Sequence, residues 1–196
     1  MKELRQAIQE MGVGIGSRVV KVDMFLNHRI DTALLTKIGE AFHQAFAQEP
    51  VDVILTIEAS GIAAALTTAQ AFGGIPVVYA KKGKPNTMAE DYYTAEVYSF
   101  THGIANPIVV CKKYLPQGGN VLIIDDFLAN GEACAGLIEI ARQAGCRVRG
   151  IGICIEKGFQ PGGERLRGKG YKVVSLATVR SIQDGKLVLD DDVDEE

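Results

Sequence analysis

Two adjacent acids, Asp125 and Asp126, directly follow the apolar run VLII at positions 121–124. A short stretch of small and polar residues then opens a predicted helix. It contains Ala129, Asn130, Gly131, Glu132 and Ala133. Because the first N–H groups of a helix lack partners within the helix, such a stretch binds anions such as a phosphate group. Two neighbouring carboxylates suit two vicinal hydroxyl groups, so the pattern predicts a site for a ribose 5-phosphate. A helix-capping turn without a ligand is the alternative interpretation.

Polar or small residues also follow three other apolar runs, at the point where each run ends. They are Glu58, Ala59, Ser60 and Gly61 after residues 51–57, Lys81 and Lys82 after residues 76–80, and Lys157 and Phe159 after residues 148–156. In open parallel sheets, ligands bind beyond the carboxyl ends of the strands, so we expect these residues to converge with the two acids. Small side chains let backbone N–H groups approach a ligand closely, and a lysine adds a point charge. Ordinary turns and solvent-exposed lysines are the alternatives.

The apolar periodicity of the chain alternates between helical and strand patterns. It predicts helices over residues 1–11, 32–47, 62–72 and 132–144, and strands over residues 18–22, 51–57, 76–80, 120–124, 148–156 and 172–179. Asp31 is a predicted N-cap, and hairpins are expected where residues 95–100 pair with 107–111 and within residues 181–189. The polar residues 81–94 predict a long loop. Alternating helices and apolar strands indicate an α/β fold with a mostly parallel, twisted sheet flanked by helices.

Composition and charge narrow the class of protein. The chain has 196 residues, 47% of them hydrophobic and 23% charged, and a formal net charge of −3. This is typical of one globular domain, and no dense basic stripe points to nucleic acid. Four cysteines without a C-x-x-C pair predict buried thiols in a reducing cytoplasm, and no signal peptide is expected. The uncharged residues 59–80 are long enough to span a bilayer, but GGIP at 73–76 favours a helix, a turn and a strand instead.

Several segments together resemble the type I phosphoribosyltransferase family. VLIIDDFLANG at 121–131 resembles the family signature, and TIEASGI at 56–62, TAEVYSF at 94–100 and GICIEKGFQP at 152–161 extend the resemblance over nearly the whole chain. KVDMFLNH at 21–28 is similar to a segment of the family members that act on xanthine. Most of the family has threonine or serine in the phosphate loop where this chain has Asn130 and Ala133. The phosphate would therefore depend more on backbone N–H groups.

The resemblance implies the type I phosphoribosyltransferase fold in a single domain over residues 1–196. The expected core spans about residues 31–180, and a small hood combines about residues 1–30 with the C-terminal hairpin. The implied reaction joins a purine, with xanthine expected, to 5-phospho-α-D-ribose 1-diphosphate (PRPP) and releases diphosphate. As the reacting carbon becomes oxocarbenium-like, the charge of the leaving group must be neutralised. We expect Mg²⁺, held mainly by PRPP, diphosphate and water, to do this, since the sequence has no cluster of metal ligands.

The resemblance also implies a role for each candidate site residue. Asp125 and Asp126 are the expected catalytic pair, acting mainly on the ribose, while residues 58–61, Lys81 and residues 129–133 bind PRPP. The expected xanthine ligands are Val20, Asn27, Lys157 and Phe159. The Lys157 ammonium donates to a 6-oxo group, which argues against adenine, Asn27 suits the 2-oxo edge, and Phe159 offers a stacking face. Residues 81–94 are expected to close over the site, and Lys81 or Lys82 to reach the other site of a homodimer.

Several other functions stay open at this stage. One is a guanine or hypoxanthine enzyme, and another is a non-catalytic PRPP-sensing regulator that binds nucleic acid, although the chain has no room for a helix-turn-helix domain. A dinucleotide-dependent oxidoreductase is a third, because GVGIG at 12–16 superficially resembles a dinucleotide loop. No serine or cysteine with a paired base is evident, so direct displacement without a covalent intermediate is expected. The expected partners are small-molecule substrates, with no nucleic acid and no membrane.

Overall fold

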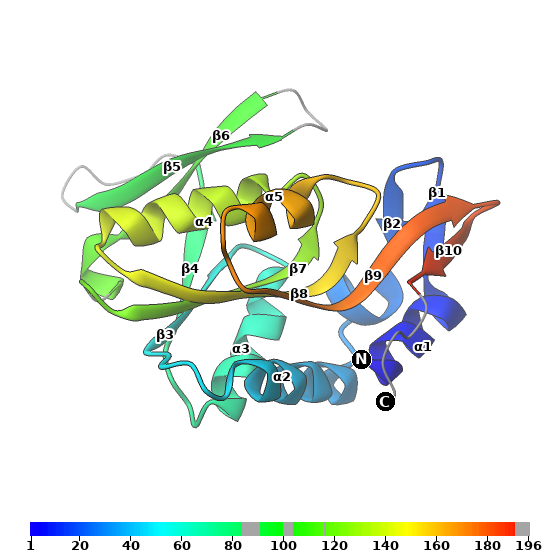
Figure 1. The fold of residues 1–196 in the computed structure, drawn as a ribbon, viewed down its shortest axis with the longest axis horizontal. Helices are drawn as coiled ribbons and strands as arrows, with labels where there is room; N and C mark the ends of the chain where they lie inside the picture. The colour runs from blue at the N-terminus through cyan, green and yellow to red at the C-terminus, as the bar shows by residue number, and fades with distance from the viewer. Residues whose placement is uncertain (84–90, 100–103, 116, 191–196) are drawn as a thin grey trace.

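The computed structural model describes residues 1–83, 91–99, 104–115 and 117–190, and Figure 1 shows their arrangement. The helices are α1 (Lys2–Met11), η1 (Asp23–Asn27), α2 (Thr32–Phe46), α3 (Gly61–Ala71), η2 (Lys112–Tyr114), α4 (Glu132–Gln143) and α5 (Gly162–Gly168). The strands are β1 (Val13–Ile15), β2 (Val19–Lys21), β3 (Val53–Ile57), β4 (Val77–Lys82), β5 (Tyr92–Ser99), β6 (Ile104–Cys111), β7 (Asn120–Leu128), β8 (Arg147–Lys157), β9 (Val173–Gln183) and β10 (Lys186–Leu189).

An eight-stranded sheet forms the centre of the structure, in the order β10-β9-β8-β7-β3-β4-β6-β5. The strands β9, β8, β7, β3 and β4 run parallel, while β10, β6 and β5 are antiparallel to their neighbours. Helices α2 and α3 cover one face, and α4 and α5 cover the other (Figure 1). The β3 strand is buried along its whole length, as expected for a strand that is covered on both faces. The predicted mostly parallel, helix-flanked sheet is confirmed.

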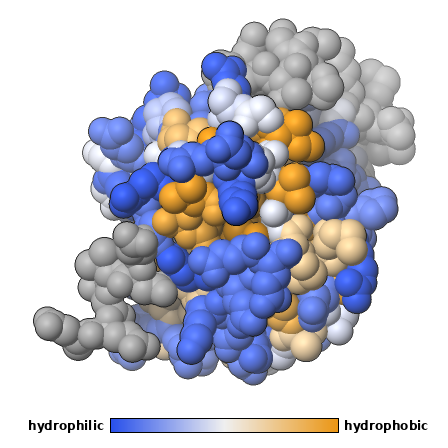
Figure 2. Space-filling model, turned by 90° about the vertical axis from the view of Figure 1, so that its right-hand side faces the viewer, coloured by the Kyte–Doolittle hydropathy of each residue, from blue (hydrophilic) through white to orange (hydrophobic). Residues whose placement is uncertain are grey.

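The N-terminal and C-terminal segments lie side by side at one end of the sheet. The hairpin β1–β2 packs beside β9 and β10, and the N–H of Gly14 donates to the carbonyl of Gly185 at 2.8 Å (Figure 1). Figure 2 looks onto this end and shows hydrophobic surface among hydrophilic side chains. Val13, Ile15 and Val19 of the hairpin are exposed. Both ends of the described chain, which the sequence assigns to a small hood, therefore lie together at one end of the sheet.

Most predicted elements are found close to their expected bounds. The Asp31 side chain caps α2 by accepting the N–H of Leu34 at 3.0 Å, and β5 pairs with β6 in the predicted hairpin. Residues 59–80 form a helix, a turn and a strand, and among the described residues no helix combines the length and hydrophobicity needed to cross a membrane. Cys111, Cys134 and Cys154 are buried and Cys146 is half-buried, so the prediction of buried thiols holds for three of the four.

Some predicted boundaries were wrong, and one alternative is excluded. Residues 12–16 do not form a dinucleotide loop, because Val13–Ile15 is a strand paired with β2. The Asp125–Asp126 pair belongs to β7, which continues to Leu128 and still pairs with β8 at that point. Lys81 and Lys82 are the last residues of β4, so the loop expected over residues 81–94 is shorter. Residues 84–90 and 191–196, which include the rest of the expected lid and most of the acidic tail, lie outside the described residues.

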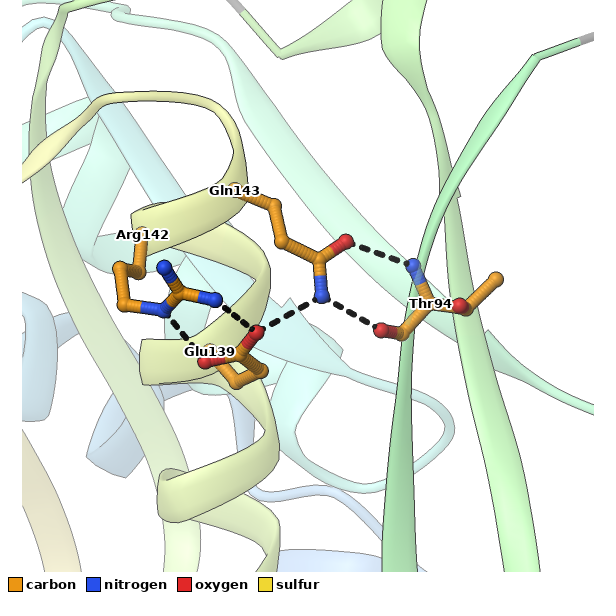
Figure 3. Close-up of polar contacts among 4 residues, drawn as sticks. All are labelled: Thr94, Glu139, Arg142 and Gln143. Atoms are coloured by element: carbon orange, nitrogen blue, oxygen red, sulfur yellow. Dashed lines mark hydrogen bonds and ion pairs between the residues drawn. The ribbon is translucent and has the colours of Figure 1, made fainter.

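A side-chain network joins α4 to the edge strand β5. The Gln143 amide accepts the N–H of Thr94 at 3.2 Å and donates to its carbonyl at 2.8 Å (Figure 3). The Glu139 carboxylate accepts a hydrogen bond of 2.9 Å from the Gln143 amide and two of 2.7 Å from Arg142. Hydrogen bonds from Arg142 and Gln143 lower the pKa of Glu139 to about 2. The C-terminal end of α4 is thereby fixed, and the N-terminal end of this helix opens onto the candidate site.

Candidate active site

A cavity of about 740 Å³ lies at the carboxyl ends of β3, β7 and β8. The predicted site residues that line it are Glu58, Ser60, Asp125, Asp126, Ala129, Asn130, Gly131, Glu132, Ala133 and Lys157. The predicted residues that do not line it are Val20, Asn27, Ala59, Gly61, Lys81 and Phe159. The structure therefore brings together the acids, the phosphate loop and one of the predicted base-binding residues, as the convergence of strand ends requires.

The predicted phosphate loop, residues 129–133, runs from the end of β7 into the first turn of α4. Gly131 is the residue before the helix and has a left-handed backbone with φ of 87°, which a side chain would strain. Its carbonyl accepts the N–H of Ala135 at 2.9 Å and so begins the helix. The unpaired N–H groups of the first helical turn therefore open onto the cavity, where an anion gains both hydrogen bonds and the favourable end of the helix dipole.

Asp125 and Asp126 are both buried at the end of β7, with 4% and 7% of their surface exposed. The Asp125 carboxylate accepts the N–H of Asp126 at 3.0 Å. Burial and the neighbouring Asp126 charge raise the pKa of Asp125, and the hydrogen bond from the Asp126 N–H and the Lys82 charge only partly offset this. The Asp125 carboxylate is therefore costly to hold ionised, and hydroxyl donors or a bound cation would relieve that cost.

A glycine is also required at position 61, next to the Asp125 carboxylate. A Cβ atom on Gly61 would lie 2.5 Å from Oγ1 of Thr56 and 2.7 Å from Oδ1 of Asp125. Thr56 is fully buried, and its hydroxyl has no hydrogen-bond partner among the described residues. Gly61 does not line the cavity, yet it sets the space in which the Asp125 carboxylate lies.

Asp125→Asn is expected to raise the free energy of unfolding at neutral pH. The folded-state pKa of Asp125 lies above the unfolded value of about 3.9, so ionisation destabilises the fold as pH rises through the folded-state pKa. The advantage of the variant should vanish below about pH 4, where the carboxyl is protonated in both states. Urea unfolding of both proteins at several pH values measures this difference in the free energy of unfolding. Asp23→Asn, at an exposed ion pair, is the control, and equal stability of Asp125→Asn and wild type at pH 8 would contradict the prediction.

The loop that begins at Glu58 approaches the cavity from β3. The peptide bond between Glu58 and Ala59 is cis, and the Glu58 carboxylate accepts the backbone N–H of Lys82 at 2.5 Å. Lys82 lines the cavity, whereas Lys81, the lysine chosen from the sequence, does not. Lys81 and Lys82 are successive residues of β4 whose side chains point to opposite faces of the strand, and Lys82 is the one that lines the cavity.

Lys157 stands on the opposite side of the cavity, at the end of β8. Its ammonium donates to the carbonyl of Arg18 at 3.1 Å and lies 5.6 Å from the centre of the Phe127 ring. Burial lowers the pKa of Lys157, and the Asp126 charge opposes that change. Phe127 and Phe159 both pack against the hydrophobic core on the α2 side of the sheet, but only Phe127 lines the cavity, where its ring lies next to Lys157.

Other cavity residues were missed by the sequence reasoning. They include Arg18, Phe127 and Gln160. Phe127 directly follows the acid pair, so its place in the family signature was a signal that could have identified it. Val20 is buried in β2, and Asn27 is exposed at the end of η1. Both lie in the hood, whose position over the cavity no local pattern predicts.

The donor chemistry of the cavity suits a hard cation that keeps most of its water. Among the described residues, no group of three or more His, Cys, Asp or Glu side chains is placed to hold a metal ion. The two buried carboxylates of Asp125 and Asp126 are hard oxygen donors. This set fits Mg²⁺ that is held mainly by substrate oxygens and water.

Several known proteins are similar in sequence to nearly the whole of this chain. No family model matches the chain. A xanthine phosphoribosyltransferase of Bifidobacterium adolescentis is 50% identical over 182 residues, which are 93% of this chain and 94% of that protein. The enzyme of the same name from Geobacillus thermodenitrificans is 48% identical over 193 residues, which are 98% of this chain and 99% of that protein.

The similarity to solved structures concerns the fold alone. The crystal structure of adenine phosphoribosyltransferase from Rhodothermus marinus superimposes with a TM-score of 0.72 at 20% identity, covering 91% of this chain and 97% of that one. The predicted type I phosphoribosyltransferase fold is confirmed by this match and by the sheet order. Since relatives about half identical over nearly their whole length share one name, the chain belongs to the xanthine phosphoribosyltransferase family, a family of pentosyltransferase enzymes.

Proposed function

We propose that this chain joins xanthine to PRPP and forms xanthosine 5′-monophosphate and diphosphate. The bond from the anomeric carbon to the diphosphate oxygen breaks, a bond from that carbon to a purine nitrogen forms, and this nitrogen loses its proton. The observation that supports the proposal is the buried Asp125–Asp126 pair beside the phosphate loop, with Lys157 across the same cavity. The relatives that are named for the same activity add support.

In the proposed complex, the phosphoribosyl group lies along the end of β7. The 5-phosphate accepts hydrogen bonds from the N–H groups of residues 129–133, and the ribose hydroxyls donate to Asp125 and Asp126. The diphosphate lies toward residues 58–61 and Lys82. Mg²⁺ bound to substrate oxygens and water near the two acids would neutralise the charge that develops on the leaving diphosphate. Holding both substrates in place makes the displacement effectively intramolecular.

Base recognition is proposed to centre on Lys157. Its ammonium suits the 6-oxo group of a purine, and the face of Phe127 next to it suits stacking. Three further residues are proposed to contact the base. Asn27 and Val20 would do so from the hood, and Phe159 from the segment that follows β8. Guanine and hypoxanthine, which also carry a 6-oxo group, are the bases that compete with xanthine in this proposal.

The assembly and location are further parts of the proposal. We propose a homodimer in the cytoplasm, and Lys81, which does not line its own cavity, is the lysine available to a neighbouring site. Small molecules are the proposed partners, with neither nucleic acid nor membrane involved. Sedimentation of the purified chain measures the dimer, and a monomer with full activity would contradict it.

Product formation from PRPP and Mg²⁺ tests the function, with xanthine, guanine, hypoxanthine and adenine compared in parallel. Xanthine is expected to react best and adenine worst, and a preference for adenine would contradict the role of Lys157. Asn27→Ala should reduce the preference for xanthine over hypoxanthine by about 10- to 100-fold, because a polar partner of the 2-oxo group is lost. An unchanged ratio would remove Asn27 from the site. The control is Gln44→Ala, which removes a side-chain amide from an exposed position of α2 and should leave the ratio unchanged.

A further inference from the structure

The first residue of α5 lies directly against the phosphate loop. The N–H of Gly162 donates to the carbonyl of Ala129 at 3.0 Å. A Cβ atom on Gly162 would lie 2.3 Å from that oxygen, 2.7 Å from the nitrogen of Gly131 and 2.8 Å from the carbonyl carbon of Asn130. Only glycine therefore lets these two stretches of backbone touch, and the contact is between backbone atoms that cannot rotate away.

The same helix is anchored to the end of β8. Glu156 is 6% exposed and receives two hydrogen bonds from Arg167 of α5, at 2.8 and 2.7 Å, and another from Ser175 of β9. Burial alone would raise the pKa of Glu156, but the hydrogen bonds from Arg167 and Ser175 outweigh it and lower that pKa. A Cβ atom on Gly163 would lie 1.8 Å from the Glu156 carboxylate, so the helix packs tightly on this side as well.

A short segment of the cavity wall is held between these two anchors. Lys157 directly follows Glu156, and Gln160 stands two residues before Gly162. Both side chains line the cavity, and the N–H of Gln160 donates to the carbonyl of Lys157 at 2.9 Å. The Gln160 side-chain oxygen is buried and has no hydrogen-bond partner among the described residues. This segment, residues 157–160, faces the side of the cavity where the base is proposed to bind.

We propose that Gly162 is a positioning residue that couples phosphate binding to base binding. The Ala129 carbonyl, which accepts from Gly162, and the Asn130 N–H belong to one peptide group. A phosphate that accepts from this N–H polarises the peptide group and makes the carbonyl a stronger acceptor. The hydrogen bond to Gly162 then tightens, and residues 157–160 are held in place for the base. The proposal rests on the proposed function of the cavity.

The coupling is measured as the ratio of the xanthine Kd of the enzyme alone to that of the enzyme saturated with ribose 5-phosphate. Titration calorimetry on the full chain gives both values, and linkage lets the same factor be read from the ribose 5-phosphate Kd. A factor of about 10 is expected for wild type, within the usual range of coupling between two sites. In Gly162→Ala the factor should fall to about 1, because the added methyl group separates the two backbones.

Matched variants distinguish this role from a general effect on folding. Gly168→Ala, at the other end of α5, adds the same methyl group where nothing lies within 4 Å, and should keep the wild-type factor. Arg167→Met removes the anchor at β8 without touching the phosphate loop, so it should lower the factor while leaving the ribose 5-phosphate Kd unchanged. If Gly162→Ala does not fold, the coupling factor measured for Arg167→Met tests the proposal instead.

Two results would overturn the inference: a wild-type factor of 1, or a wild-type factor retained in Gly162→Ala and Arg167→Met. In either case, turnover of xanthine by the wild-type enzyme would leave the proposed function standing. Absence of turnover with every base would instead count against the proposed function itself.

Discussion

Asp126→Asn is expected to lower kcat/KM for PRPP by about 100-fold. Hydrogen bonds that involve a charged group contribute about 1.5–3 kcal/mol each, and the buried Asp126 carboxylate has little water to replace a lost ribose contact. Asparagine has nearly the same shape, so the fold and the packing around β7 should be retained. Steady-state kinetics with varied PRPP at saturating xanthine measures the loss.

The control for Asp126→Asn is Glu40→Gln, which makes the same change from carboxylate to amide at an exposed position of α2. It should leave kcat/KM unchanged. Calorimetric binding of ribose 5-phosphate adds a second readout, because the sugar should bind more weakly to Asp126→Asn even without turnover. Unchanged kcat/KM and unchanged sugar binding would together remove the carboxylate from the proposed site.

Lys157→Met is expected to lower kcat/KM for xanthine by about 10- to 100-fold. Methionine keeps the length and the apolar stem of lysine but loses the charged donor for the 6-oxo group. Arg18 also loses the hydrogen bond that Lys157 gives to its carbonyl, so the hood contact should weaken as well. The effect should appear with all 6-oxopurines and leave the ribose 5-phosphate Kd close to that of wild type.

Lys186→Met, on the exposed end of β10, provides the matched loss of a lysine away from the cavity. Comparing xanthine with adenine separates recognition from packing, since adenine has no 6-oxo group to lose. An equal loss with both bases would show that Lys157 acts through the packing of the hood rather than through the base.

Local patterns predicted the main elements because each has its own chemical signal. The apolar spacing and the Asp31 cap defined α2, and the small residues before Glu132 defined the start of α4. The α5 helix was missed because it is only seven residues long and begins with two glycines, which local propensity disfavours. The β1 strand was missed for a related reason, since Gly14 is required where a Cβ atom would lie 2.2 Å from Ile182.

The sequence by itself determined the family and the positions of the acid pair and of the predicted phosphate loop, because these depend on residue types at fixed local spacing. Only the tertiary structure decided that Lys82 rather than Lys81, and Phe127 rather than Phe159, lines the cavity. Successive side chains of β4 point to opposite faces, so an uncertainty of one residue at its end exchanges the two lysines. Phe127 belongs to β7 and Phe159 follows β8, so only the packing of these segments decides which ring lines the cavity. The contact of α5 with the phosphate loop likewise joins segments that lie far apart in the sequence, and the packing of the sheet alone brings them together.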